Sequence, residues 1–261
     1  MGSTSQTYTS LDPDRLKVSG EGAWDAAQYI LDELWMPYVE PQILELDRPV
    51  YERGLPNLEA EEKHTVFSLL AKWDQNNLLE LHSARTVQPG PEGKVKVFNA
   101  HKSLTQDWQI GDRRWRNAYE CKIPGPSKSL PAGSQICRFL VPPGKGVKIS
   151  ITDRSDFYHQ MSCSLERSRS NLLWPQMELG EFKGTRAYER FVARAQALPR
   201  RIDRTVFGDE LHGPLFADRD VSDQCPVFGA FRSVLQGGQL GVEFGIAAHV
   251  GSLLEKGALQ E

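Results

Sequence analysis

Residues 147–161 read VKISITDRSDFYHQM. Val147, Ile149 and Ile151 alternate with polar residues, and this period of two predicts a half-buried strand. Asp153 continues the apolar side of the alternation, at the point where the composition changes to that of a helix. A carboxylate at the end of a strand either caps the following turn or holds a ligand. Which of the two applies to Asp153 decides how the fold and the function are interpreted.

The composition is that of a globular chain, with 39% hydrophobic and 25% charged residues among 261. No apolar run approaches the roughly 20 residues that a membrane helix needs, and the first residues do not resemble a signal peptide. The four cysteines form no Cys-x-x-Cys pair, which argues against a zinc site and for reduced thiols. We therefore expect a cytoplasmic or nuclear protein that has no membrane partner.

Charge is distributed unevenly along the chain. Residues 1–100 carry 9 basic and 16 acidic side chains, residues 101–204 carry 19 and 10, and residues 205–261 carry 3 and 8. A basic middle between acidic ends fits a polyanionic partner such as nucleic acid, and it equally fits a solvated basic surface. Charge alone does not separate these two interpretations.

Helices and strands are predicted in mixed order, which favours an α+β fold. Helices are predicted over residues 22–35, from Asn57 onward, and over 156–168, 186–197 and 241–257. The helix that follows Asn57 has an apolar stripe at helical spacing, formed by Val66, Leu69, Leu70 and Trp73. Residues 95–100 are expected to form a hairpin with 109–112.

Three groups of residues have the composition of a functional site. The first is Asp153 with Asp156 and His159, which suits a Mg²⁺ ligand set, a helix cap or a small metal-dependent hydrolase. The second is the segment QIGDRRWRN, 109–117, whose arginines Arg113, Arg114 and Arg116 could contact phosphate or pair internally with Asp112. The third is Gly237–Gly238, before a helix, which permits close approach of a ligand or simply a turn.

Taken in this order, the three groups resemble the reverse transcriptases (RNA-directed DNA polymerases) of retroelements, from about Asn57 to the C-terminus. Asp112, Arg114 and Asn117 keep the spacing of the Asp-aromatic-Arg-x-x-Asn motif of the fingers. Asp153, Tyr158, His159 and Gln160 match the first palm motif, an aspartate followed five residues later by an aromatic residue and His-Gln. Leu235, Gln236, Gly237 and Phe244 resemble the second palm motif, with leucine in place of the usual proline.

The resemblance implies a role for each matched residue. Asp153 would be the first catalytic carboxylate and would bind Mg²⁺. Nucleotide contacts would come from Tyr158 under the sugar, from Gln236 and Gly237 along the pocket, and from Lys102, Arg113 and Arg114 near the phosphates. The partners would be an RNA or DNA template-primer and a dNTP, joined by two-metal nucleotidyl transfer.

The resemblance also implies a partial right-hand polymerase fold. We expect an N-terminal helical extension over 1–56, a fingers-like region over 57–146 and the first half of a palm over 147–261. No Asp-Asp pair occurs in the sequence, so the Tyr-x-Asp-Asp motif that would complete the metal site is missing. The expected protein is therefore a divergent, C-terminally truncated member that is inactive as this chain, and the alternative is a non-catalytic remnant that binds RNA or DNA.

Overall fold

The computed structural model describes residues 8–30, 32–52, 55, 61–87, 94–130, 140–146, 154–197 and 220–258. Asp153, the strand predicted over 147–152 and Asn57 lie outside the described residues. The elements in chain order are β1 (Tyr8–Thr9), η1 (Ala26–Gln28), α1 (Asp32–Val39), η2 (Pro41–Leu44), α2 (Lys63–Gln75), β2 (Leu79–Ser83), β3 (Lys94–His101), β4 (Asp107–Asp112), α3 (Arg114–Ala118), η4 (Pro126–Ser129), α5 (Phe157–Gln160), α6 (Leu165–Arg169), β5 (Leu172–Leu173), β6 (Met177–Glu178), η5 (Leu179–Phe182), α7 (Arg186–Ala197), β7 (Pro226–Phe231) and α10 (Gly241–Glu255).

The described strands form one sheet that is mostly antiparallel. Its main path runs β1-β3-β5-β7-β2, with β4 pairing to β3 and β6 pairing to β7. Among these pairs, β3 with β5 is the parallel one. Helices and strands are mixed along the chain around this sheet, so the predicted α+β class is confirmed.

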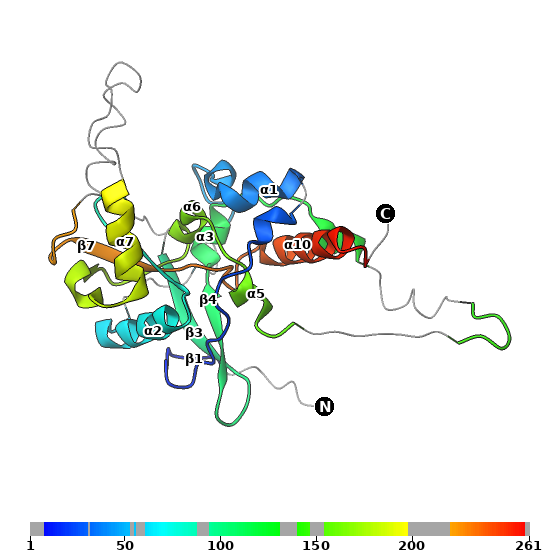
Figure 1. The fold of residues 1–261 in the computed structure, drawn as a ribbon, viewed down its shortest axis with the longest axis horizontal. Helices are drawn as coiled ribbons and strands as arrows, with labels where there is room; N and C mark the ends of the chain where they lie inside the picture. Colours follow the sequence, from blue (N-terminus) through cyan, green and yellow to red (C-terminus); the bar gives the residue numbers. More distant parts are fainter. Residues whose placement is uncertain are drawn as a thin grey trace, which may run out of the picture.

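The helices α2 and α7 lie on one side of the molecule and α10 lies on the other, with α3 and α6 between them (Figure 1). The helices α2 and α7 contact each other and β2, and α1 contacts α10. The predicted stripe of α2 is confirmed as core, because Val66, Leu69, Leu70 and Trp73 are each at most 1% exposed. The indole Nε1 of Trp73 donates to Gln109 Oε1 at 2.7 Å and so fixes α2 to β4.

The helix α7 covers β2, which lies at the end of the sheet path. Arg190 and Arg194, one turn apart on α7, donate to the backbone carbonyls of Leu79 and Leu81. Arg194 Nη1 also pairs with Glu80 Oε1 at 2.7 Å. Side-chain donors therefore satisfy carbonyls of β2 that an uncovered edge strand would leave unpaired.

The helices predicted over 22–35 and 156–168 are wrong in extent, and both errors have the same cause. Trp24 donates its backbone N–H to Gln160 O at 2.9 Å and accepts from Ser162 N at 2.8 Å. These long-range hydrogen bonds form an isolated parallel β-bridge between Trp24 and Met161. The backbone around each of these residues is therefore not helical. The chain instead forms η1 and α1 in the first region, and α5 and α6 in the second.

The predicted division into three regions stays a prediction. Strands from each of them share the sheet, because β1 precedes residue 57, β3 lies between 57 and 146, and β7 follows residue 147. No helix among the described residues is both long and apolar enough to cross a membrane.

Candidate functional site

The outer face of the β3–β4 hairpin combines aromatic and basic side chains. Cross-strand partners project to the same side of a sheet, so Phe98 lies beside Ile110 and Ala100 beside Trp108. Trp108 is 38% exposed, and Lys102 Nζ lies 3.6 Å from the centroid of its ring. This separation is that of a cation–π contact. We call this surface, made of Phe98, Lys102, Trp108 and Ile110, the hairpin face.

A surface hollow of about 470 Å³ lies where the hairpin ends; it is lined by Phe98, Gly111, Asp112, Arg113, Arg114 and Gly237. Gly111 donates its N–H to Gln236 O at 2.8 Å, and Asn117 Nδ2 donates to Gly237 O at 2.9 Å. These bonds hold the turn 235–238 against the end of β4. Arg114 and Gly237, which are far apart in the sequence, therefore border one hollow.

The turn at Gly237 requires glycine for two reasons. Its φ of +112° lies in a region that residues with a side chain rarely adopt. A Cβ added at this position would lie 2.0 Å from the carbonyl oxygen of Gly111. The absence of a side chain at Gly237 therefore allows the turn and the hairpin to touch.

Arg114 forms a two-pronged ion pair with Asp112 at the rim of the hollow. Its Nε donates to Asp112 Oδ1 at 2.9 Å, and its Nη2 donates to Oδ2 at 2.6 Å. Burial raises the pKa of Asp112, but the hydrogen bonds and charge of Arg114 outweigh burial and leave that pKa below its usual value. Because the side chain of Arg114 is 55% exposed, an incoming anion can reach it by competing with Asp112.

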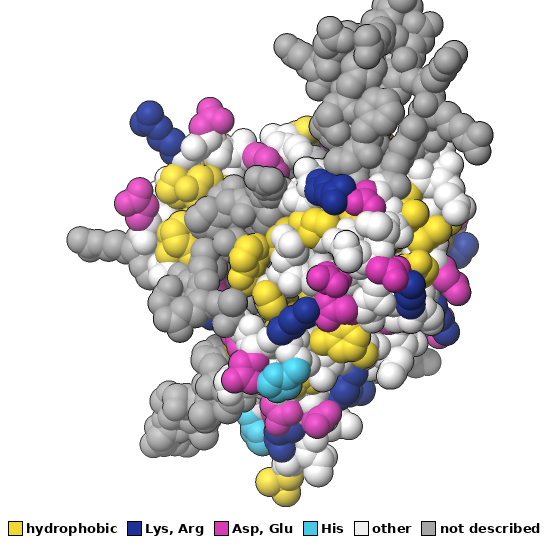
Figure 2. Space-filling view, turned by 90° about the vertical axis from the view of Figure 1, so that its left-hand side faces the viewer, with side chains coloured by type: hydrophobic (Ala, Val, Ile, Leu, Met, Phe, Trp, Pro, Cys, Tyr) yellow, Lys and Arg dark blue, Asp and Glu magenta, His cyan; other side chains and the backbone are white. Residues whose placement is uncertain are grey.

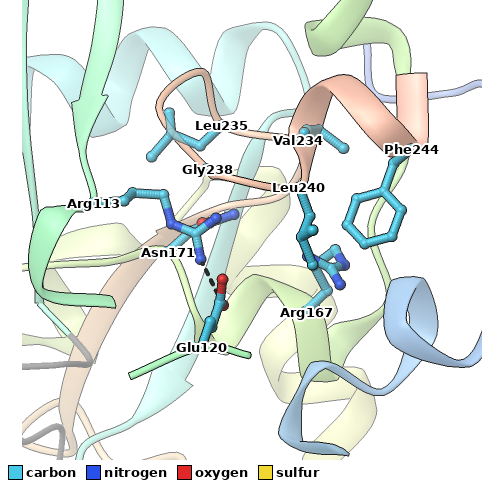
Figure 3. Close-up of a pocket in the computed structure, with 10 residues that line it drawn as sticks. Arg113, Glu120, Arg167, Asn171, Val234, Leu235, Gly238, Leu240 and Phe244 are labelled. Atoms are coloured by element: carbon cyan, nitrogen blue, oxygen red, sulfur yellow. Dashed lines mark hydrogen bonds and ion pairs between the residues drawn. The ribbon is translucent and has the colours of Figure 1, made fainter. Parts of the chain in front are cut away.

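A buried cluster of arginines lies next to the hollow (Figure 3). Arg113 Nη2 lies 3.4 Å from Glu120 Oε1 and 3.2 Å from Ser170 Oγ. Arg116 Nε donates to the same Glu120 oxygen at 2.8 Å. Arg167 enters from the opposite side and donates to backbone carbonyls in α1. We call Arg113, Arg116, Arg167 and Glu120 the arginine cluster.

The ionisation of the arginine cluster follows from its burial. Burial lowers the pKa of Arg113 to about 10, so this guanidinium stays charged at neutral pH. Burial also raises the pKa of Glu120, but the charges of Arg113 and Arg116 outweigh burial and hold it below its usual value. Three cations therefore surround one buried anion.

The cavity inside the cluster is small, about 10 Å³, which is room for about one water molecule. Arg113 Nε and Asn171 Oδ1 are buried and have no hydrogen-bond partner among the described residues. A phosphate group does not fit this space. Arg113, predicted to contact the nucleotide, lines the surface hollow but is only 5% exposed, and its guanidinium is hydrogen-bonded to Glu120 and Ser170.

Part of the positive charge of residues 101–204 is therefore internal. Arg113, Arg116 and Arg167 are buried, and Arg190 and Arg194 pair with Glu80. On the face seen in Figure 2, Lys and Arg side chains are interspersed with Asp and Glu and form no single basic patch. The local excess of cations in the sequence overstates the positive charge that a partner could reach.

The structure separates the other predicted site residues. Tyr158, at the start of α5, lines a groove beside α10 and not the Arg114 hollow. Asp156 Oδ2 lies 3.5 Å from Lys17 Nζ and accepts a hydrogen bond from the hydroxyl of Ser19. His159 Nδ1 lies 2.9 Å from the backbone oxygen of Ser19. Asp156 and His159 thus hold the N-terminal segment around Lys17 and Ser19 in place.

No cluster of candidate metal ligands is found in the described part of the chain, which contains no group of three His, Cys, Asp or Glu side chains that could hold a metal ion. Asp112, the carboxylate at the hollow, is already paired with Arg114. A magnesium site would therefore depend on Asp153, which lies outside the described residues.

Two features of the site, the hairpin face and the arginine cluster, were not predicted from the sequence. Alternation in β3 and β4 could have indicated that Phe98 and Trp108 share the outer face of the hairpin. The arginine cluster had only one local signal, the four-residue spacing of Arg116 and Glu120. Arg167 joins the cluster and Ser170 accepts a hydrogen bond from Arg113 through tertiary packing, and neither residue had such a signal.

The fold and the site define an α+β protein with an aromatic and basic strand face that leads into a surface hollow. Comparisons with protein-family models, with curated proteins and with solved structures found no match.

Proposed function

We propose that this chain is a reverse transcriptase-like protein that binds nucleic acid without extending it. The observation that carries the proposal is the hairpin face, which runs from Lys102 and Trp108 to the hollow at Arg114 and Gly237. An exposed indole offers a platform on which a base stacks, and neighbouring cations meet the phosphates of the same strand. A right-hand polymerase relationship is part of this proposal.

The position of Arg114 and Gly237 on one hollow supports the proposal. The resemblance assigns Arg114 to a fingers-like region and the turn at Gln236–Gly237 to a palm-like region, and both border the same hollow. A guanidinium with planar, paired donors suits a phosphate group. The ligand of the hollow would then be a nucleotide phosphate or the backbone of a template-primer.

Neither metal binding nor catalysis follows from the described residues. Mg²⁺ bound by Asp153 stays a prediction of the resemblance, and the matching carboxylates of Tyr-x-Asp-Asp are missing from the sequence. The hydrolase alternative has no supporting observation among the described residues. The side chains of Asp156 and His159 are both engaged in hydrogen bonds with Ser19.

Binding of a fluorescein-labelled single-stranded oligonucleotide, followed by anisotropy, tests the proposal. Replacing Trp108 with alanine should weaken binding about tenfold, because stacking on one aromatic ring contributes about 1–3 kcal/mol. The matched control is Trp35→Ala, since Trp35 is 42% exposed but lies on α1, away from the hairpin. Equal affinities for these two variants would contradict the assignment of the hairpin face.

The same assay in a salt series tests the hollow. Arg114→Ala should make the slope of log affinity against log salt concentration shallower by about one phosphate contact. A complex that lacks one cation–phosphate contact releases about one counterion fewer when it forms. Arg85→Ala is its control, because Arg85 is also about half exposed and paired with an aspartate, Asp220. Slopes that are equal in Arg114→Ala and the wild type would exclude Arg114 from the interface.

Primer extension with dNTPs and Mg²⁺ should give no product with this chain. A two-metal site needs carboxylates on both sides of the ions, and Asp153 alone cannot hold the pair. The assay should include a complete polymerase as a positive control. Incorporation of dNTPs that disappears in Asp153→Ala would show that the chain is catalytic after all.

A further inference from the structure

A second hollow lies between α5 and α10 and is separate from the hairpin face. It has a volume of about 320 Å³, and its walls include Phe157 and Tyr158 from α5 with Val242, Ile246 and His249 from α10. Arg154 also lines it. We call this space the α5–α10 groove. Its volume falls within the range of roughly 300–1,000 Å³ that small-molecule sites occupy.

The α10 wall of the groove is an apolar stripe. Val242, Ile246 and Val250 follow one another at intervals of four residues and so lie on one face of the helix. Val242 is 50% exposed, and Ile246 and Val250 are partly exposed. Eight residues of helix span about 12 Å, so the stripe is long and narrow. Such a surface suits an extended aliphatic chain.

The polar side chains that line the groove are those of Arg154, Tyr158 and His249. The guanidinium of Arg154 lies 5.4 Å from the ring centroid of Trp24 and 5.8 Å from that of Phe157. No carboxylate among the described residues forms an ion pair with Arg154. His249 Nδ1 is buried and has no hydrogen-bond partner in the described part of the chain. Burial and the charge of Arg154 lower the pKa of His249, so its imidazole is neutral at neutral pH.

We propose that the α5–α10 groove binds a small amphipathic carboxylate, such as a medium-chain fatty acid. The alkyl chain would lie along the stripe from Val242 to Val250, and the carboxylate would meet the guanidinium of Arg154. Charge complementarity selects this class, because Arg154 has no described counter-ion and would repel a cationic head group. The site does not depend on nucleic-acid binding at the hairpin face.

Calorimetric titration with octanoate, octanol and octylammonium tests the proposal on the whole chain. Octanoate should bind about tenfold more tightly than either of the other two, because it alone gains a charge-assisted hydrogen bond with Arg154. Arg154→Gln should remove this preference and leave the affinity for octanol unchanged. The matched control is Arg186→Gln, since Arg186 is an exposed arginine on α7, away from the groove.

A second variant separates loss of the site from loss of the fold. Val242→Asp places a carboxylate in the groove at an exposed position and should weaken octanoate binding about tenfold while the circular dichroism spectrum stays that of the wild type. Two results would overturn the proposal: octanoate that binds the wild type no better than octylammonium does, or a preference that survives Arg154→Gln.

Discussion

Replacing Glu120 with glutamine should lower the free energy of unfolding by about 3–5 kcal/mol. The carboxylate is the shared partner of Arg113 and Arg116 in the interior, at 3.4 and 2.8 Å. Without its charge, Arg113 loses its carboxylate partner and Arg116 keeps only the half-exposed Glu45, at 2.8 Å. The buried guanidiniums then repel one another, which costs far more than breaking an exposed pair. Chemical denaturation of the two proteins at neutral pH measures the difference.

Glu166→Gln is the matched control, because it makes the same chemical change in a partly exposed ion pair with Arg169. This change should cost less than about 1 kcal/mol. A loss of similar size in Glu120→Gln would mean that the arginine cluster does not hold the fold together.

The low pKa of Glu120 adds a pH test of the same interaction. A carboxyl group whose pKa is lower in the folded state stabilises that state above its unfolded pKa, here about 4.5. This stability is lost as the pH falls through the folded pKa. Below about pH 5, the unfolding free energy of the wild type should therefore fall more steeply than that of Glu120→Gln.

Replacing Gly237 with alanine should destabilise the fold by about 3–5 kcal/mol and weaken nucleic-acid binding. The substitution forces a side chain into a backbone region that glycine favours, and its Cβ collides with the Gly111 carbonyl at 2.0 Å. The turn must then move away from β4, which opens the hollow beside Arg114. Denaturation and the oligonucleotide assay measure the two effects.

Gly184→Ala is the control variant that separates the cost of the collision from the cost of the backbone strain. Gly184 also has a positive φ, +82°, but a Cβ there would meet no atom within 4 Å. Its substitution should therefore cost only the strain, about 1–2 kcal/mol. Equal losses in the two variants would show that contact between the turn and the hairpin contributes nothing to stability.

The two proposed sites divide the residues that the resemblance groups together. Arg114 and Gly237 share the hollow at the hairpin end, while Tyr158 lies in the α5–α10 groove. An oligonucleotide and a fatty acid should therefore bind without competing. The two binding assays, each repeated in the presence of the other ligand, can be interpreted independently.

Elements with a regular local pattern were predictable from the sequence. The stripe of α2, the hairpin of β3 and β4, and the helices α7 and α10 all lie where periods of 3.6 or 2 residues placed them. These patterns are local because each reports which side of one element faces the core. The α+β class followed from their mixed order. The resemblance also groups Arg114 with Gly237, and both residues line the hollow at the end of the hairpin.

Only the tertiary structure decided which side chains face inward at the site. Arg113 and Arg114 are adjacent in the sequence, yet the first is buried against Glu120 and Ser170 and the second pairs with Asp112 at the surface. Trp24 likewise ended the predicted helices by bonding to residues more than 130 positions away. Sequence alone determined the elements that have a regular pattern, because local periodicity creates them. Long-range hydrogen bonds and the cost of burying an unpaired charge determined how they meet, and neither leaves a local pattern in the chain.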